Sequence, residues 1–342
     1  MNPDLPPHHD SVAASADPRF ISTSRLPFVS EDAEHYRYPV RLQALQKSLP
    51  RRVLSEADWL HWQRNGYVIV KQAILREQAL ATLEQVWAFT GKCADQPHTW
   101  LRPDSDFAPG WSWQLDQYAK GMVEMYHHQQ LWDNRTAERI YDAFVDVWDV
   151  EQLWVSIDRV NLNTPTIGNR ATLGNFMHWD IDINQPVLPL RAHGLLMLCD
   201  TAIETGGFQC VPGLFGQIDS WRAQRAPGSH PHDPAPEEYA RFAVEQPQLQ
   251  AGDMLVFNTH LLHGIAKNLT QDQVRAVQYV AMSPALERHT AVRETRIRWW
   301  REVVHPDCNP SFLGDPLRPE ASRYGRASLS PLGRKLLGLE DW

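Results

Sequence analysis

The run GNFMHWDIDIN, at residues 174–184, places one histidine and two aspartates in a stretch that otherwise has the pattern of a β-strand. In an extended strand, residues two apart point to the same face. His178 and Asp180 are therefore expected to project together, while Trp179 and Ile181 point the other way. One face of the predicted strand carries an imidazole and a carboxylate side by side.

Length and charge limit what the chain can be. Its 342 residues and 39.3 kDa could form two average domains or one large β-domain. The formal net charge is −8 and the pI is near 6.0. These values argue against a nucleic acid or an anionic membrane surface as the main partner, because such partners favour a basic stripe. We therefore expect a small-molecule substrate, no nucleic acid and no membrane.

The cysteine pattern and the lack of long apolar runs predict a cytoplasmic protein. The cysteines fall at wide spacings without a CxxC pair, so neither a disulfide framework nor a thiolate zinc site is indicated. They are Cys93, Cys199, Cys210 and Cys308. The first residues lack the apolar stretch of a signal peptide, and no apolar run approaches the roughly 20 residues of a membrane helix. A monomer or a homodimer is expected.

Local patterns predict helices in the first half of the chain and strands after residue 150. Ser55, with Asp58 three residues on, caps a short helix that Gly66 ends, and the strand YVIV follows. Apolar residues at helical spacing predict helices over 77–90 and 135–148. Short runs separated by turn residues then favour a β-sandwich or barrel over a parallel α/β sheet. These runs are LWVSIDRVNL, FMHWDIDI, HGLLMLCD, GFQCV, GDMLVFN and RAVQYVAM.

A third ligand is expected from GDMLVFNTHLLHGIAKNLTQDQVRAVQYV, where His260 and His263 lie between two predicted strands. Two histidines and one carboxylate on one face of an iron(II) ion leave three positions open. That is enough for a bidentate co-substrate and dioxygen. Asp182 shares the strand parity of Asp180, so it is an alternative ligand, or else an outer or solvent-facing group.

Arg275, twelve residues beyond His263, opens the last predicted strand. A guanidinium group at this point can bind a carboxylate through two parallel hydrogen bonds, which a lysine does less specifically. Each feature alone has an ordinary explanation: a chance HxD pair, a hydrogen-bonded histidine or a surface ion pair. Their order on a strand-rich chain indicates a metal centre with a dicarboxylate ligand.

Together these residues make the chain resemble the phytanoyl-CoA dioxygenase family of iron(II)- and 2-oxoglutarate-dependent oxygenases. The resemblance spans residues 53–283 and is carried by WLHWQRNGYVIV, MHWDID, ETGGFQCVPG and GDMLVFNTHLLHG, with Asn268 and Arg275. It implies a double-stranded β-helix, or jelly roll, that is mainly β with flanking helices. The domain is expected over 51–285, with a tail and irregular arm over 1–50 and a helical extension packed on it over 286–342.

The resemblance also implies roles for individual residues. His178, Asp180 and His263 would bind iron and form the catalytic centre, and Arg275 would pair with the distal carboxylate of 2-oxoglutarate. His260 would be only a neighbour.

The other carboxylate of 2-oxoglutarate often takes its partner from the strand before HxD. In VSIDRVNLN, Arg159, Asn161 and Asn163 share a face. Asn161 or Arg159 is therefore the candidate, and a structural role in the sheet is equally open.

The implied reaction oxidises a substrate C–H bond with dioxygen and gives succinate and carbon dioxide. Related halogenases lack the carboxylate ligand, so Asp180 points to hydroxylation or another oxygenative outcome. A hydrophobic or cyclic small molecule in a biosynthetic tailoring step is the expected substrate. Several tryptophans could wall the site or simply pack in the core: Trp100, Trp111, Trp113, Trp299 and Trp300.

Two other functions remain open at this point. One is a jelly-roll metal enzyme that does not use 2-oxoglutarate, for which Arg275 would have no purpose. The other is a non-catalytic β-sandwich binding protein, in which the histidines and the aspartate are merely hydrogen-bonded.

Overall fold

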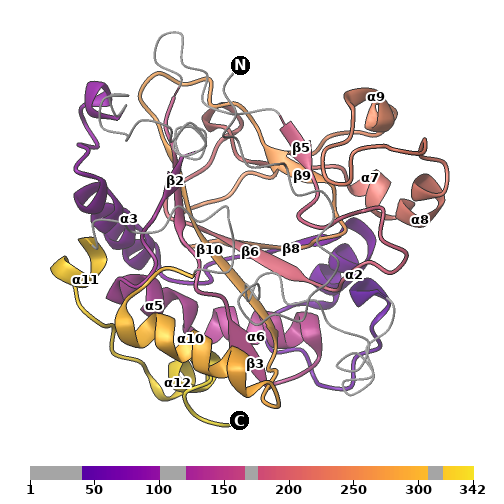
Figure 1. The fold of residues 1–342 in the computed structure, drawn as a ribbon. Coiled ribbons are helices and arrows are strands. Elements are labelled where there is room, and N and C mark those ends of the chain that lie inside the picture. Colours follow the sequence, from indigo (N-terminus) through magenta and orange to yellow (C-terminus); the bar gives the residue numbers. More distant parts are fainter. Residues whose placement is uncertain (1–40, 101–120, 166–175, 307–318) are drawn as a thin grey trace, which may run out of the picture.

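Two antiparallel β-sheets face each other across an apolar core (Figure 1). The computed structural model describes residues 41–100, 121–165, 176–306 and 319–342. The core between the sheets contains Leu195 and Phe257 from the large sheet and Phe208 from the small one, each at most 5% exposed. Two packed antiparallel sheets with flanking helices confirm the predicted double-stranded β-helix and rule out the parallel α/β alternative.

The large sheet is organised around one long strand. Its order is β1-β8-β6-β10-β4-β2, and the small sheet has the order β5-β9-β7. Strand β10 is ten residues long, so it borders β6 along one edge and pairs with both β4 and β3 along the other. The strands are β1 (Tyr67–Val70), β2 (Met122–Val123), β3 (Leu153–Val155), β4 (Val160–Asn163), β5 (Phe176–His178), β6 (Ala192–Met197), β7 (Phe208–Cys210), β8 (Met254–Asn258), β9 (His263–Ile265) and β10 (Arg275–Pro284).

The first long helix has the end signals that its sequence predicts. Ser55 and Asp58 form a capping box at the start of α2 (Glu56–Asn65), and Gly66 ends the helix in the left-handed region with φ of 77°. A Cβ atom at Gly66 would also lie 2.8 Å from the ring of Phe215. The chain can therefore turn at once into β1, which pairs with β8.

Helices cover the outer face of the large sheet (Figure 1). Along β10, Val280 and Met282 point toward this helical layer, whereas Val277 points toward the small sheet. None of the described helices is long and apolar enough to cross a membrane. The helices after α2 are α3 (Arg76–Thr90), α5 (Gln129–Arg135), α6 (Glu138–Trp148), α7 (Pro212–Phe215), α8 (Ile218–Arg222), α9 (Pro236–Tyr239), α10 (Thr290–Glu302), α11 (Pro319–Arg323) and α12 (Pro331–Leu337), with short 3-10 turns at Leu42–Ala44, Pro97–Thr99 and Ile203–Thr205.

The C-terminal helices belong to the same layer. α10 and α12 share one apolar cluster with α6. Arg296 of α10 is fully buried, and its guanidinium group donates to three carbonyl oxygens. The acceptors are Val155 of β3, and Leu336 and Leu337 of α12. These bonds tie the C-terminal segment to the edge of the large sheet.

The predicted strand LWVSIDRVNL forms two strands, β3 and β4, separated by residues 156–159. Both strands pair with β10. At the break, the amide of Ala281 donates to the hydroxyl of Ser156 at 2.9 Å and not to a carbonyl oxygen. The sequence pattern predicted extended backbone correctly, but it could not show that a side chain takes over as acceptor.

The tryptophans that the sequence offered as possible walls of the site pack in the core wherever the structure describes them. Trp299 and Trp300 belong to the cluster between the helices and the large sheet. Trp100 is 1% exposed and stacks on Trp87, with ring centroids 5.8 Å apart. Trp111 and Trp113 lie outside the described residues. Of the two predicted roles, core packing is the one seen for the three that are described.

Candidate metal centre and anion site

Three predicted ligands converge where β5 and β9 of the small sheet pair. His178 ends β5 and His263 begins β9, and the two residues are direct partners in the antiparallel pairing. Asp180 completes the group, with Oδ1 3.4 Å from His178 Nε2 and Oδ2 3.6 Å from His263 Nε2. One ligand atom from each residue lies within 4.8 Å of the others, and the described part of the chain contains no second cluster of this kind.

Asp180 reaches the group from a bend, not from within a strand as the sequence predicted. β5 ends at His178, and the next amide, of Trp179, donates to the carbonyl oxygen of His232 at 2.9 Å. The predicted alternation persists because Trp179 and Ile181 are buried on the opposite side, at 1% and 3% exposure. Burial of these two side chains turns His178 and Asp180 to a common side.

The glycine after His263 allows the two ligand strands to approach closely. Gly264 is the pairing partner of Met177 between β9 and β5. A Cβ atom at Gly264 would lie 1.8 Å from the carbonyl oxygen of Phe176, a contact that only separation of the strands could relieve. The pairing that sets His178 against His263 therefore requires glycine at this position.

The protonation states of the group suit a metal ion. His263 Nδ1 lies 3.0 Å from the carbonyl oxygen of Leu261. Because a carbonyl can only accept, Nδ1 carries the hydrogen and Nε2 presents its lone pair on the side of Asp180. Burial, with a smaller contribution from His178, lowers the pKa of His263 to about 4, so the ring is neutral at pH 7.

Asp180 is ionised at neutral pH. Burial acts to raise the pKa of Asp180, but its hydrogen bonds with His178 and His193 and its interaction with His263 outweigh burial. The pKa consequently lies well below its ordinary value. The group thus offers two imidazole nitrogens and one carboxylate oxygen.

Arg275 is a buried cation whose described contacts are all neutral. It begins β10 and is 1% exposed, and its Nη1 donates to Asn161 Oδ1 at 3.0 Å. It also interacts with Tyr279 and Cys199, and burial lowers its pKa. No carboxylate among the described residues pairs with it. A buried charge without a counter-ion is costly, so this position favours an anionic ligand.

The two residues predicted for the other carboxylate have different partners. Asn161 lies on β4 and points to the same inner face as Arg275, which it contacts. Arg159 precedes β4, and its Nη1 lies 2.7 Å from Glu124 Oε1, with both side chains largely buried. The structure therefore brings Asn161 to Arg275 and gives Arg159 a carboxylate partner of its own.

Two residues of this region were not predicted. Nδ1 of His193, on β6, lies 3.1 Å from Asp180 Oδ2, and Tyr279 of β10 interacts with both Arg275 and Asp180. Burial raises the pKa of Tyr279 above its ordinary value, so the phenol is neutral at pH 7. The alternation of RAVQYVAM puts Tyr279 on the face of Arg275 and could have indicated it. The position of His193 depends on the register between strands that are distant in the sequence. No pattern in the sequence indicates this register.

His260, the alternative ligand, is directed away from the group. It is 1% exposed, and its Nε2 donates to the carbonyl oxygen of Pro189 at 3.0 Å. Its own carbonyl oxygen accepts from Trp179 Nε1 at 3.1 Å. Both bonds join the segment before β9 to the segments on either side of the bend at Asp180. His260 is therefore a structural residue of the site wall.

Replacing His260 with glutamine is expected to flatten the acid side of the stability profile. Burial lowers the pKa of His260 to about 4, from an ordinary value of 6.5. As the pH falls from 6.5 to 4, the unfolded chain takes up a proton that the folded chain does not, so the free energy of unfolding falls by about 3 kcal/mol. Glutamine keeps an amide donor near the Nε2 position but does not titrate.

Urea unfolding at pH 7 and pH 5 measures this effect in metal-free protein. The wild-type chain should lose more stability between these pH values than the His260→Gln variant. His98→Gln, at an exposed position, should follow the wild type. Equal losses in all three proteins would contradict the assignment.

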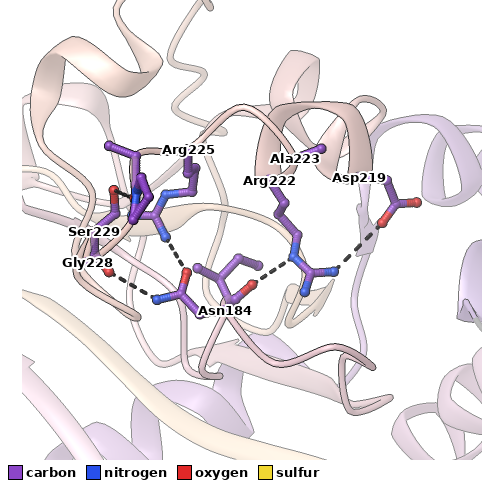
Figure 2. Close-up of a pocket in the computed structure, with 10 residues that line it drawn as sticks. Asn184, Asp219, Arg222, Ala223, Arg225, Gly228 and Ser229 are labelled. Atoms are coloured by element: carbon purple, nitrogen blue, oxygen red, sulfur yellow. Dashed lines mark hydrogen bonds and ion pairs between the residues drawn. The ribbon is translucent and has the colours of Figure 1, made fainter.

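A surface hollow beside the bend does not provide a second anion site. It has a volume of about 510 Å³ (Figure 2). Arg222 Nε donates to the carbonyl oxygen of Ile183 at 2.7 Å, and Arg225 Nη1 donates to Asn184 Oδ1 at 2.9 Å. The two guanidinium groups hold the segment after Asp180 in place. The lining residues are Ile183, Asn184, Asp219, Arg222, Ala223, Arg225, Ala226, Pro227, Gly228 and Ser229.

Comparisons with known proteins give consistent results. The family model described as phytanoyl-CoA dioxygenase (PhyH) matches residues 62–277, more than half of the chain. The Ava biosynthesis cluster protein O of Aspergillus versicolor is 22% identical over 285 residues, which cover 72% of this chain and 89% of that protein.

Solved structures agree on the fold. The hypothetical protein JW0805 of Escherichia coli has a TM-score of 0.59 at 15% identity, covering 83% of this chain and 82% of that one. A provisionally assigned oxidoreductase of Salmonella typhimurium LT2 has a TM-score of 0.60 at 16% identity, covering 90% and 88%. At these identities the likeness concerns the fold alone.

Proposed function

Because the chain belongs to the phytanoyl-CoA dioxygenase family, we propose that it is an iron(II)- and 2-oxoglutarate-dependent dioxygenase that hydroxylates a C–H bond of a hydrophobic or cyclic small molecule. One arrangement carries this proposal: a His-Asp-His group lies in one site with a buried arginine that has no carboxylate partner among the described residues. The first suits the metal ion and the second suits a dicarboxylate co-substrate.

His178, Asp180 and His263 fit iron(II). Two imidazoles and one carboxylate are the ligand set of non-haem iron(II) oxygenases, whereas thiolate-rich sets favour zinc or copper(I). The three ligand atoms already lie within 4.8 Å of one another, with Nε2 of His263 oriented by the bond from Nδ1 to Leu261. The pairing of β5 with β9 holds both histidines on rigid strands.

Arg275 fits the distal carboxylate of 2-oxoglutarate. Its guanidinium group is buried, oriented by Asn161 and next to Tyr279, which also interacts with Asp180. We infer that Asn161 holds Arg275 in place for this ligand. Anion binding by Arg159 would require its ion pair with Glu124 to open. A dicarboxylate would supply the counter-ion that no described residue gives to this buried arginine.

Iron(II) with 2-oxoglutarate and dioxygen supplies the oxidant for a C–H bond, and succinate and carbon dioxide are the co-products. The chain's own residues would bind the metal and orient the co-substrate. Asp180 occupies the ligand position that halogenases of this type leave to chloride, which favours hydroxylation. The relative from the Ava biosynthesis cluster supports a biosynthetic role.

An anaerobic absorption titration tests the cofactors. Iron(II) followed by 2-oxoglutarate should produce a weak visible charge-transfer band that requires both additions. Succinate, which has two carboxylates but no 2-oxo group, should produce none. Iron binding without the band would favour the metal enzyme that does not use 2-oxoglutarate, and failure to bind iron would favour a binding protein. Hydroxylation itself is tested by a product one oxygen atom heavier than its substrate.

A further inference from the structure

The two oxygens of Asp180 have different neighbours. Oδ1 lies 3.4 Å from Nε2 of the ligand His178. Oδ2 lies 3.1 Å from Nδ1 of His193, which is outside the set of three ligand residues, and 3.6 Å from Nε2 of the ligand His263. His193 therefore contacts the carboxylate although it is not one of the three candidate metal ligands.

His193 is fixed by its own surroundings. It lies on β6 in the middle of the large sheet, paired with Phe257 of β8 on one side and Ala281 of β10 on the other. The ring of Phe257 meets the His193 ring edge-on, with centroids 5.7 Å apart. Phe257 also packs on His263, with centroids 4.4 Å apart. The same phenylalanine thus sets the relative position of His193 and one metal ligand.

We propose that His193 is a positioning residue that donates its Nδ1 hydrogen to Asp180 Oδ2 and thereby fixes the orientation of this carboxylate for the metal ion. This inference rests on the proposed function. A carboxylate held by a fixed hydrogen-bond donor would meet the metal ion already oriented.

Two substitutions separate this role from a general effect on packing. The amide of asparagine can reach the position of the histidine Nδ1, and the amide of glutamine reaches that of Nε2. His193→Asn should therefore keep the bond to Asp180, whereas His193→Gln should lose it. Loss of such an outer partner typically weakens metal binding by about 10- to 100-fold.

The measurement is the affinity for iron(II) under anaerobic conditions, obtained by competition with a coloured chelator and without 2-oxoglutarate. His193→Gln should bind about 10- to 100-fold more weakly than the wild type, and His193→Asn within about threefold of it. Thermal unfolding identifies the folded variants. If His193→Gln does not fold, His193→Leu serves as the donor-free variant under the same criterion.

If the donor-free variant bound iron(II) as tightly as the wild type, the role of His193 would be overturned and the proposed function would stay intact. An affinity of the asparagine variant as low as that of the donor-free variant would do the same. If the wild-type protein itself bound no iron(II), the proposed function would fail, and the role of His193 with it.

Discussion

Replacing Asp180 with alanine is expected to lower the affinity for iron(II) by more than about 100-fold and to abolish turnover. The substitution removes one of three ligands, so the loss should exceed the roughly 100-fold that an outer partner of a ligand can cost. It also removes the negative charge that would balance the metal ion, since imidazole ligands contribute none. Anaerobic iron(II) binding and co-substrate turnover measure the two effects separately.

Asp182 offers the matched control. It follows Asp180 by two residues and shares its parity, but its Oδ1 accepts the amide of Asn184 at 2.8 Å and it lies outside the ligand group. Asp182→Ala should therefore bind iron(II) as the wild type does. Retained iron affinity in Asp180→Ala, or its loss in Asp182→Ala, would show that the wrong carboxylate has been assigned.

The pairing of His178 with Asp180 was predictable because alternation follows from burial. Trp179 and Ile181 are buried on the opposite side, and their burial keeps the predicted faces even though β5 ends at His178. The choice of His263 over His260 as the third ligand could not be made from alternation. It came from the resemblance, and its physical basis is a contact that spacing does not show, between His260 and the carbonyl oxygen of Pro189.

Residues that depend on strand register could not be predicted. His193 reaches Asp180 only because β6 pairs with β8 and β10 in one particular register. Arg159 shares the predicted face of Asn161, yet its charge is matched by Glu124, 35 residues earlier in the chain. Neither contact can be predicted from periodicity in the sequence, because each depends on which distant strands lie side by side.

Replacing Arg275 with methionine is expected to weaken 2-oxoglutarate binding by about 30-fold or more. Loss of one partner of a buried, hydrogen-bonded charge pair costs about 2–5 kcal/mol. The stability of the protein without its co-substrate should change by no more than about 1 kcal/mol. The guanidinium group has only neutral described contacts there, and methionine removes a desolvated charge while keeping similar volume. Calorimetric titration and urea unfolding measure the two quantities.

Arg296 is the control, because it is equally buried but fully committed to the fold. Arg296→Met leaves the carbonyl oxygens of Val155, Leu336 and Leu337 without their donor. This should cost about 3 kcal/mol or more of stability. The folded fraction should bind 2-oxoglutarate normally. The two arginine variants are therefore expected to show opposite effects, one on ligand affinity and the other on stability.

A ligand without the distal carboxylate tests the role of Arg275 independently of the substitution. 2-Oxovalerate keeps the 2-oxo acid but has a methyl group where 2-oxoglutarate has its distal carboxylate. If Arg275 binds that carboxylate, the wild type should bind 2-oxovalerate about as weakly as Arg275→Met binds 2-oxoglutarate. The variant should then hardly distinguish the two ligands, since removing both partners costs little more than removing one. Continued preference for 2-oxoglutarate in Arg275→Met would place the distal carboxylate on another residue.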